Sequence, residues 1–350
     1  MWIAIGVIVG LILIPLLVIF VARVLNGKKY AINTPNGVDE ELYIPVNGQE
    51  QYLFIKGKDA ANPVILHLHG GPGAPDGMAT YSFSKDLVDA FTVVCWDQRG
   101  CGNTYYRNRD KDADNATVTW EQAIADIDAV VDYLRERFGQ EKVYLLGHSY
   151  GTLLGSTYAL KHPEKVAYYV AVSQMVSVKD AETRSYEKAR KMAAEQSKST
   201  AKMDEAYEIF MKENTLLSMG KLRRCTIPYH KAPRAKNTIL IGLVSPYFTW
   251  DAFKWQAKMM LRMQESIRLG QKLIDYVMAA NLMEEEAEYQ VPVLFVAGEC
   301  DPVCPVDCVK EYMDKLAAPK KELAVFEGCG HSPNYDDSEE FAKLMKGLLR

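Results

Sequence analysis

The sequence lacks an excess of positive charge. Its 350 residues include 41 Lys and Arg against 45 Asp and Glu, which gives a formal net charge of −4. A domain that binds nucleic acid usually carries a basic face or stripe. The composition therefore predicts no nucleic-acid partner.

The sequence also lacks a disulfide framework. Its seven cysteines are odd in number and show no short, even spacing of the kind found in small secreted domains. This pattern favours a reducing compartment. With 48% apolar and 25% charged residues and no internal repeat, the chain is predicted to be an ordinary globular protein.

Charge is absent from residues 2–22, a run that is long enough to cross a membrane as a helix. Pro15 lies inside this run, but membrane helices tolerate proline. The alternative is a cleaved signal peptide, which would need a basic start and a small-x-small cleavage site, and neither is clear. We therefore predict an uncleaved transmembrane anchor over residues 2–25.

The first positive charges of the chain, Arg23, Lys28 and Lys29, follow the apolar run. Positive residues beside a membrane span usually remain on the cytoplasmic side. The sequence therefore predicts a single-pass, membrane-anchored protein whose remaining residues lie in the cytoplasm.

Residues 26–40 are rich in Gly, Asn, Pro and charge, and they are predicted to form a linker. A hairpin is expected around Asn47-Gly48, between strands at 41–46 and 49–56. Beyond the hairpin, apolar runs and helical periodicity alternate. The expected strands are 64–69, 92–96, 143–147, 168–172, 292–297 and 323–326, and the expected helices are 80–90, 120–138 and 338–349.

Near-continuous apolar strands that alternate with helices indicate an α/β fold, a mostly parallel sheet with helices on both faces. This alternation stops between residues 176 and 286. A charge-rich stretch at 179–213, typical of a solvated helical face, is followed there by an aromatic cluster at 247–255. We predict a helical cap over residues 176–286, which divides the core into residues 41–175 and 287–350. The aromatic cluster is expected either to pack within the cap or to line a binding site.

Gly147-His148-Ser149-Tyr150-Gly151 follows an apolar strand and precedes a helix rich in small residues. Gly-x-Ser-x-Gly in this setting is the signature of a nucleophile elbow. The tight turn exposes the serine hydroxyl at the carboxyl end of the strand, and the flanking positions need glycine because the neighbouring chain lies against them. The helix amino terminus behind Ser149 favours developing negative charge. Ser149 is therefore the candidate nucleophile.

A serine nucleophile needs a base, and an acid that orients the base. His331 lies in a glycine-rich loop directly after the last predicted strand, and Asp301 follows the strand before it. The chain order Ser…Asp…His is that of the α/β-hydrolases. Glu299 and Asp307 are alternative acids in the same region.

An oxyanion hole would complete the site. In this arrangement one backbone N–H comes from the residue after the nucleophile, here Tyr150, and another comes from the loop after the third strand. That loop reads His69-Gly70-Gly71-Pro72-Gly73. We choose Gly71 as the second donor, since Pro72 has no N–H. This chemistry requires no cofactor and no metal.

Two groups of residues offer a metal site as an alternative. Cys300, Cys304, Cys308 and Cys329 lie near His331 in the sequence, and His67-x-His69 offers a second pair. Zinc sites more often use cysteine pairs that are two to four residues apart in two separate knuckles. We therefore interpret the four thiols as buried or incidental groups beside the acid loop.

Taken together, these motifs resemble the proline iminopeptidase group of α/β-hydrolases. The motifs that carry the resemblance are His69–Gly73, Asp97-Gln98-Arg99-Gly100-Cys101-Gly102, Gly147–Gly151, Gly298–Asp301 and Gly330-His331-Ser332. The resemblance implies Ser149, Asp301 and His331 as the triad, Gly71 and Tyr150 as oxyanion donors, and a helical cap that selects the substrate.

The chain departs from the pattern of that group in three places. The elbow reads Gly-His-Ser-Tyr-Gly where iminopeptidases usually have Gly-Gly-Ser-Trp-Gly, and the second motif ends Gly-Asn-Thr in place of Gly-x-Ser. The cap of that family carries glutamates that bind the free amine of the substrate, and this cap offers five candidates. The available residues are Glu182, Glu187, Glu205, Glu208 and Glu265. Arg99 is expected to pair with a carboxylate and to brace the loops beside the site.

Three functions follow from this interpretation. The first is an aminopeptidase of the proline iminopeptidase type, which acts through an acyl-enzyme on small peptides. The second is an esterase or amidase of the same fold. The third is a non-catalytic binding protein on this scaffold, since a fold alone does not fix a function.

Overall fold

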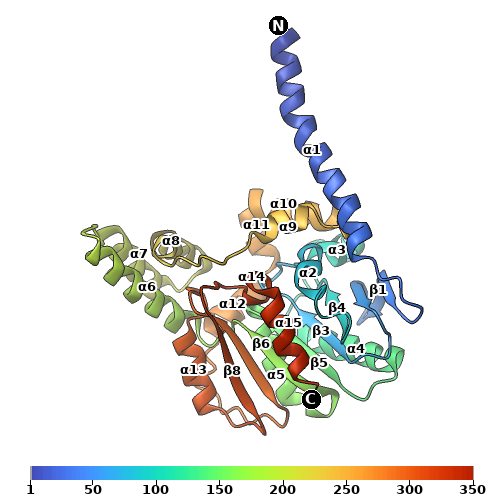
Figure 1. The fold of residues 1–350 in the computed structure, drawn as a ribbon. Helices are drawn as coiled ribbons and strands as arrows, with labels where there is room; N and C mark the ends of the chain where they lie inside the picture. Colours follow the sequence, from blue (N-terminus) through green and yellow to red (C-terminus); the bar gives the residue numbers. More distant parts are fainter. Residues whose placement is uncertain (1, 350) are drawn as a thin grey trace.

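The computed structural model describes residues 2–349, apart from the side chains of residues 2–10 and 12 (Figure 1). One eight-stranded sheet runs through its centre. Six of its strands are mutually parallel. At one edge is a hairpin whose two strands pair antiparallel, and its inner strand is antiparallel to the adjoining strand of the sheet. In spatial order the strands are β1 (Val38–Val46), β2 (Gln49–Gly57), β4 (Thr92–Trp96), β3 (Val64–Leu68), β5 (Val143–His148), β6 (Val166–Val172), β7 (Val293–Gly298) and β8 (Lys321–Phe326). This confirms the predicted mostly parallel sheet.

The hairpin forms where the sequence predicts it. Asn47 and Gly48 join β1 to β2 with φ values of 43° and 83°. Two successive residues with positive φ make the tight turn that matches the twist of antiparallel strands, and Asn-Gly is the dipeptide that adopts it most easily.

Helices cover both faces of the sheet, as predicted. Successive residues of a strand point to opposite faces, so Leu145 and Leu146 belong to different cores. The helices α4 (Trp120–Phe138), α5 (Tyr150–Lys161) and α13 (Val306–Lys315) pack on one face, and α2 (Gly77–Ser84) and α15 (Ser338–Gly347) pack on the other. Two short helices, α3 (Gly102–Asn108) and α14 (Pro333–Asp336), follow the loops at the carboxyl ends of β4 and β8.

Helix α4 has the limits that its end signals predict. The Thr119 side chain accepts a hydrogen bond from the Gln122 N–H at the amino end, and Gly139 ends the helix in a left-handed conformation with φ 62°. The predicted helix at 80–90 is displaced instead. Helix α2 begins at Gly77 and ends at Ser84, because turns that bury Leu87 and Phe91 replace the later part of the predicted helix.

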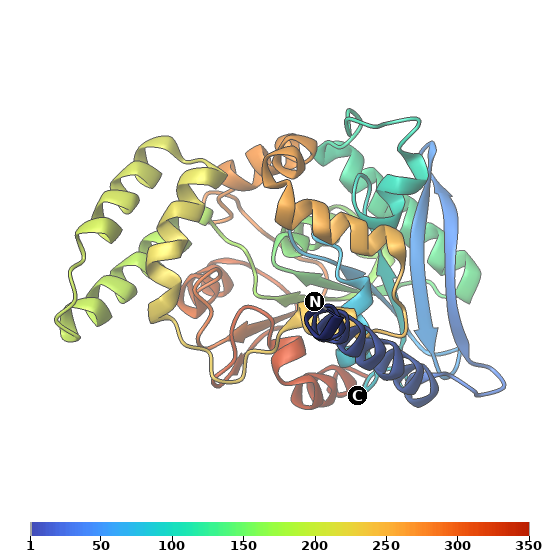
Figure 2. The ribbon, with the colours of Figure 1, turned by 90° about the horizontal axis from the view of Figure 1, so that it is seen from above.

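A helical insertion separates β6 from β7 (Figure 2). The first three helices form an arm beside the sheet, and the next three lie over the rest of the molecule on the side from which α1 projects (Figures 1 and 2). The helices are α6 (Val178–Glu195), α7 (Ala201–Glu213), α8 (Leu216–Thr226), α9 (Thr238–Leu243), α10 (Trp250–Leu261), α11 (Met263–Leu269) and α12 (Gln271–Ala279). We call α6–α12 the cap.

The linker predicted at 26–40 is partly helical. Helix α1 spans Trp2–Tyr30 and so continues five residues into the predicted linker, and β1 already begins at Val38. The end of α1 is held because Gly27 lies against Pro246 and the Tyr30 ring packs on Tyr81. Tertiary packing therefore overrides the local composition here.

The transmembrane anchor predicted at 2–25 is not supported. Much of that range consists of residues 2–10 and 12, whose side chains lie outside the described part of the chain. Among the residues that are described, no helix is both long enough and apolar enough to cross a bilayer. The predicted orientation and single-pass location depended on this span and are unsupported with it.

Candidate active site

Ser149 lies at the sharp turn between β5 and α5. Its backbone has φ 53° and ψ −122°, a conformation that a residue with a side chain rarely adopts. Ser149 is also the residue that precedes the first turn of α5. Its side chain therefore stands at the carboxyl end of a central strand and at the amino end of a helix.

The two glycines of the elbow are required by close backbone contacts. A Cβ atom on Gly147 would lie 2.6 Å from the Gly151 carbonyl oxygen. A Cβ atom on Gly151 would lie 2.0 Å from the carbonyl oxygen of Leu68, at the end of β3. Both separations are far below van der Waals contact, so only glycine fits at these positions.

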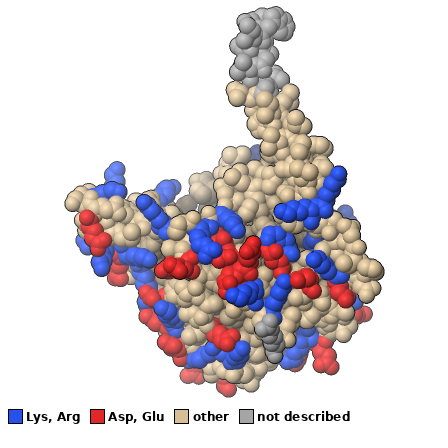
Figure 3. All heavy atoms as spheres, viewed as in Figure 1, with Lys and Arg blue, Asp and Glu red and all other residues tan. Residues whose placement is uncertain are grey.

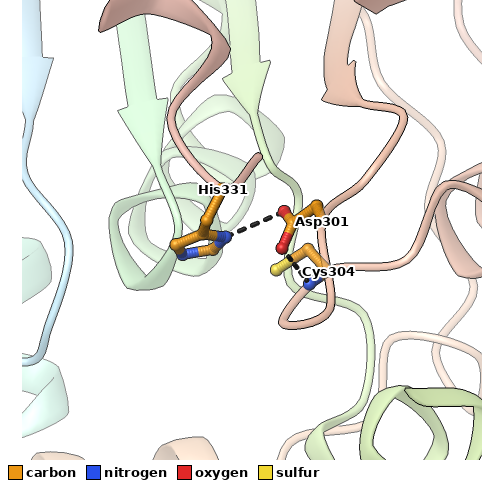
Figure 4. A group of neighbouring side chains, drawn as sticks. All are labelled: Asp301, Cys304 and His331. Carbon is orange, nitrogen blue, oxygen red and sulfur yellow. Dashed lines mark hydrogen bonds and ion pairs between the residues drawn. The ribbon is translucent and has the colours of Figure 1, made fainter. Parts of the chain in front are cut away.

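Three side chains that are distant in the sequence converge at this turn. The Nε2 atom of His331 lies 2.9 Å from Ser149 Oγ, and its Nδ1 atom lies 2.8 Å from Asp301 Oδ2. Ser149 follows β5, Asp301 follows β7 and His331 follows β8, so the three residues come from the carboxyl ends of three parallel strands. β7 and β8 are neighbours, and β6 lies between β5 and β7. Figure 4 shows His331 and Asp301 pointing toward each other from adjacent loops.

Asp301 is held as a carboxylate. Burial alone would raise its pKa, but His331 and the backbone N–H groups of Val303 and Cys304 outweigh burial and hold the pKa below its ordinary value. An ionised Asp301 accepts a hydrogen bond from the Nδ1–H group of His331, which leaves Nε2 free to accept a proton from Ser149. The alternative acids face elsewhere, since Glu299 accepts the Gly328 N–H and Asp307 is exposed in the first turn of α13.

Two residues that the sequence analysis did not identify fix the His331 backbone. The Nε2–H of His148 donates to the His331 carbonyl oxygen at 2.8 Å, and the Ser173 hydroxyl donates to the same oxygen at 3.0 Å. Burial lowers the pKa of His148 to about 4, so its ring is neutral at pH 7. His148 is the residue at which the elbow departs from the iminopeptidase pattern, and that departure was the one available signal.

The glycine-rich loop after β3 lies directly beside Ser149. A Cβ atom on Gly70 would lie 3.2 Å from the Ser149 Cβ, and Gly71 has φ 125°, which favours glycine. Among residues 2–349, neither the Gly71 N–H nor the Tyr150 N–H has a hydrogen-bond partner. The two N–H groups are therefore available to an oxygen atom of a ligand.

The Asp97–Gly102 motif is structural in its contacts. The Arg99 guanidinium donates through Nε and Nη2 to Asp126 at 2.6 and 2.9 Å, and also to two carbonyl oxygens of the β1–β2 turn. Asp97 accepts the backbone and side-chain N–H groups of Asn103. Arg99 thus pairs with a carboxylate and braces the loops, as the sequence predicts.

The first of the two alternative metal sites has little support in the geometry. Asp301, Cys304 and His331 bring one ligand-type atom each to within 4.8 Å of one another (Figure 4). His331 and Asp301 are, however, already engaged with each other and with Ser149. Burial raises the pKa of the Cys304 thiol well above its ordinary value, whereas zinc binds the thiolate.

His67 and His69 do not act as a pair either. His67 Nε2 lies 3.0 Å from Asp76 Oδ2, and the Tyr335 hydroxyl donates to the same oxygen at 2.8 Å. His69 Nδ1–H donates to the Gly70 carbonyl oxygen, and burial lowers the pKa of His69 to about 4. Each imidazole therefore has its own partners within the core.

The five glutamates of the cap differ sharply in their surroundings. Glu187, Glu205 and Glu208 are exposed, and Glu265 pairs with Lys258 at 3.0 Å. Glu182 on α6 is 1% exposed. Its Oε1 atom accepts the Arg223 Nε–H at 2.6 Å, and its Oε2 atom has no partner among the described residues. Burial raises the pKa of Glu182, Arg223 lowers it, and the nearby Asp301 raises it further.

The aromatic cluster at 247–255 has a mixed role. Trp255 is buried, and its Nε1–H donates to the Gly73 carbonyl oxygen at 2.8 Å, so α10 is fastened to the loop beside Ser149. Tyr247 packs on Phe54 at the edge of the core. Trp250 instead points outward and is 71% exposed. Most of the cluster therefore packs within the molecule.

Comparisons with known proteins find relatives that match this chain over most of its length. "Probable aminopeptidase YbaC" of Bacillus subtilis is 27% identical over 320 residues, which cover 88% of this chain and 95% of that protein. A proline iminopeptidase of Lactobacillus helveticus is 23% identical over 318 residues, which cover 87% and 96%.

Solved structures agree on the fold. A proline iminopeptidase from Mycobacterium smegmatis superposes with a TM-score of 0.60 at 20% identity, covering 89% of this chain and 97% of that one. The sequence profile described as "alpha/beta hydrolase fold" matches residues 63–338, most of the chain. The chain therefore belongs to the α/β-hydrolase family and is similar to its proline iminopeptidases.

Proposed function

We propose that the protein is a serine hydrolase in which Ser149 forms an acyl-enzyme, His331 acts as general base and then general acid, and Asp301 orients His331. One observation carries the proposal. His331 Nε2 lies 2.9 Å from Ser149 Oγ while its Nδ1 atom lies 2.8 Å from Asp301. Both distances are within the range of a working nucleophile and base.

The N–H groups of Gly71 and Tyr150 serve as the oxyanion hole in this mechanism. Tyr150 follows Ser149 in the chain, and Gly71 follows Gly70, on which a Cβ atom would lie 3.2 Å from the Ser149 Cβ. Neither N–H is used by another described group. They would stabilise the negative oxygen of the tetrahedral intermediate, and each such donor contributes about 3 to 4 kcal/mol to the transition state.

For the substrate class, we propose small peptides with a free amino terminus, as the names of the related aminopeptidases suggest. Glu182 of the cap is the residue that would bind the amino terminus of such a peptide. Its Oε2 atom is buried and without a described partner, and its carboxylate is near enough to Asp301 for the two charges to interact. A substrate ammonium group would give this oxygen the positive partner that it lacks.

Kinetics on two substrates test both levels of the proposal. We expect Ser149→Ala to lower kcat by about 10⁶ on every substrate, because the nucleophile is lost. Glu182→Gln should lower kcat/KM for an amino-terminal prolyl amide by about 10- to 150-fold, the value of a charge-assisted hydrogen bond, and leave a short-chain ester unaffected.

Glu187→Gln is the matched control, since Glu187 is exposed on the same helix. If the ester is hydrolysed and the prolyl amide is not, the aminopeptidase assignment is wrong and the serine hydrolase assignment stands. If neither substrate reacts and Ser149 cannot be acylated, the protein is a binding protein on this scaffold.

A further inference from the structure

The outer side of the cap exposes large apolar side chains. Trp250 at the start of α10 is 71% exposed, and Leu261 at its end is 83% exposed. Ile239 and Leu240 on α9 and Met263 on α11 are more than half exposed as well. Single exposed apolar residues are common, but several large ones on three neighbouring helices mark an interaction surface. We call these side chains of α9–α11 the cap patch.

Helix α1 rises from the same side of the molecule and is fastened to the cap (Figures 1 and 2). Arg23 Nε–H donates to the Leu243 carbonyl oxygen, and Asn26 Nδ2–H donates to the Val244 carbonyl oxygen, both at 2.8 Å. The Arg23 guanidinium also lies 3.6 Å from the centre of the Phe248 ring. The part of the cap patch on α9 and at the start of α10, where Phe248 contacts Trp250, therefore lies beside α1.

Between Leu11 and Ala22, the described side chains of α1 are apolar on every side of the helix. Its exposed side chains occupy nearly consecutive positions, and the larger ones are Leu11, Leu13, Ile14, Leu16, Leu17, Val18, Phe20, Val21, Val24 and Leu25. A helix that packs against one protein partner carries a single apolar stripe. A helix that is apolar all round is instead stable where its whole surface is surrounded by apolar groups. This favours lipid over a second protein surface.

Charge points the same way. Residues 11–30 and 227–270 carry ten Lys and Arg and two acidic residues, a formal charge of +8, although the whole chain has a formal charge of −4. Figure 3 shows the uncharged surface continuing from the projecting helix onto the top of the molecule, with Lys and Arg side chains along its border. An apolar surface bordered by basic residues is complementary to a bilayer with anionic headgroups.

We infer that the cap patch and α1 together contact the surface of an anionic lipid bilayer, so that the cap faces the membrane. Trp250 and the apolar side chains beside it reach the headgroup boundary, a depth that tryptophan prefers. Exposed cations such as Arg262 lie at the level of the phosphates, with their stems along the apolar surface. The inference concerns the cap and holds whether or not α1 itself crosses the bilayer.

Quenching of tryptophan fluorescence by brominated lipids tests this orientation. The full-length protein is incorporated into vesicles of phosphatidylcholine with brominated acyl chains, with and without phosphatidylserine, and compared with Trp250→Phe. The difference between the two proteins isolates Trp250 from the other four tryptophans. We expect Trp250 to be strongly quenched, and more so with phosphatidylserine present.

Two charge variants with similar exposure sharpen the test. Arg262, 72% exposed on the cap, is replaced in Arg262→Gln, and Lys343, 78% exposed on α15, is replaced in Lys343→Gln. We expect Arg262→Gln to reduce the effect of phosphatidylserine by up to about fivefold and Lys343→Gln to leave it unchanged. The inference is overturned if Trp250→Phe is quenched as strongly as the original protein, or if Trp250 is shielded because a second copy of the chain covers the cap patch.

Discussion

Two histidine–aspartate pairs in this molecule have nearly the same nitrogen–oxygen distance and very different surroundings. His331 Nδ1 lies 2.8 Å from Asp301 Oδ2, and His67 Nε2 lies 3.0 Å from Asp76 Oδ2. The free nitrogen of His331 reaches Ser149, and 27% of the His331 side chain is exposed. The His67 side chain is 1% exposed, and its Nδ1 atom has no hydrogen-bond partner among the described residues.

A histidine–aspartate pair is a candidate catalytic unit only if the imidazole nitrogen that does not contact the aspartate faces a group that can react. At His331 that nitrogen meets a hydroxyl on a strained turn, beside two free backbone N–H groups. The second nitrogen of His67, Nδ1, faces the buried core, and the Tyr335 hydroxyl donates a further hydrogen bond to Asp76. In the proposed mechanism the first pair transfers protons, whereas the second pair packs within the core.

The largest expected effect comes from breaking the first pair. Asp301→Asn leaves the shape of the site intact but removes the charge that fixes the tautomer of His331, so we expect kcat to fall by about 10⁴. The unfolding free energy should change far less than the activity. Steady-state kinetics and urea unfolding on the same preparation measure both. Activity within tenfold of the original protein would contradict the assignment of Asp301.

Acid should destabilise the protein because two of its histidines are buried in the neutral form. Burial lowers the pKa of His69 and His148 to about 4, whereas an unfolded histidine titrates near 6.5. Between these values the unfolded chain binds more protons, so stability falls as pH drops from about 6.5 to about 4 and the loss is then complete. For His69, which is 1% exposed, the loss amounts to as much as about 3 kcal/mol.

Urea unfolding at about pH 7 and about pH 4.5 checks this prediction. His148→Gln should reduce the difference in the free energy of unfolding between the two pH values. Below pH 4 a further loss is expected as Asp301 and Asp76 become protonated, because both carboxyl groups have pKa values below the ordinary one. An equal free energy of unfolding from about pH 7 to about pH 4 would show that burial does not lower the pKa of these histidines.

Breaking the second pair should affect stability and leave the chemistry nearly unchanged. Asp76→Asn weakens the contacts to His67 and Tyr335, and we expect it to lower the free energy of unfolding by about 2 kcal/mol. The kcat of the folded fraction should stay within a few-fold. A loss of activity as large as that of Asp301→Asn, without unfolding, would mean that the two pairs are not as different as their surroundings indicate.

The smallest effect concerns the support of His331. His148→Ala removes one of the two hydrogen bonds to its carbonyl oxygen, whereas Ser173 keeps the other. We expect a loss of about 1 kcal/mol of stability and less than a tenfold fall in kcat. His148→Gln, which can still donate, should restore most of both. Equal behaviour of the two variants would exclude this positioning role.

Local signals account for what the sequence could predict. The strands from β1 to β8, the Asn47-Gly48 turn and the ends of α4 follow from short patterns of apolar, capping and turn residues. The elbow and the order Ser149, Asp301, His331 follow from a motif whose geometry is set by strand ends. These features depend on neighbouring residues or on topology, so a single sequence reveals them.

The features that the sequence could not predict depend on contacts between residues that are far apart in the chain. His148 meets the His331 backbone across 183 positions, and Glu182 meets Arg223 across 41, with no local pattern that announces either. The end of α1 at Tyr30 and the shift of α2 likewise depend on packing against distant side chains. Such contacts exist only after the chain has folded.

The most direct test of the proposed mechanism is to locate the adduct of a fluorophosphonate. The reagent is added to the original protein, to Ser149→Ala and to Asp301→Asn, and the labelled peptide is identified by mass spectrometry. We predict one adduct on Ser149 in the original protein, none in Ser149→Ala and much slower labelling of Asp301→Asn. An intact protein that never reacts, or that reacts equally well without Ser149, would contradict the account.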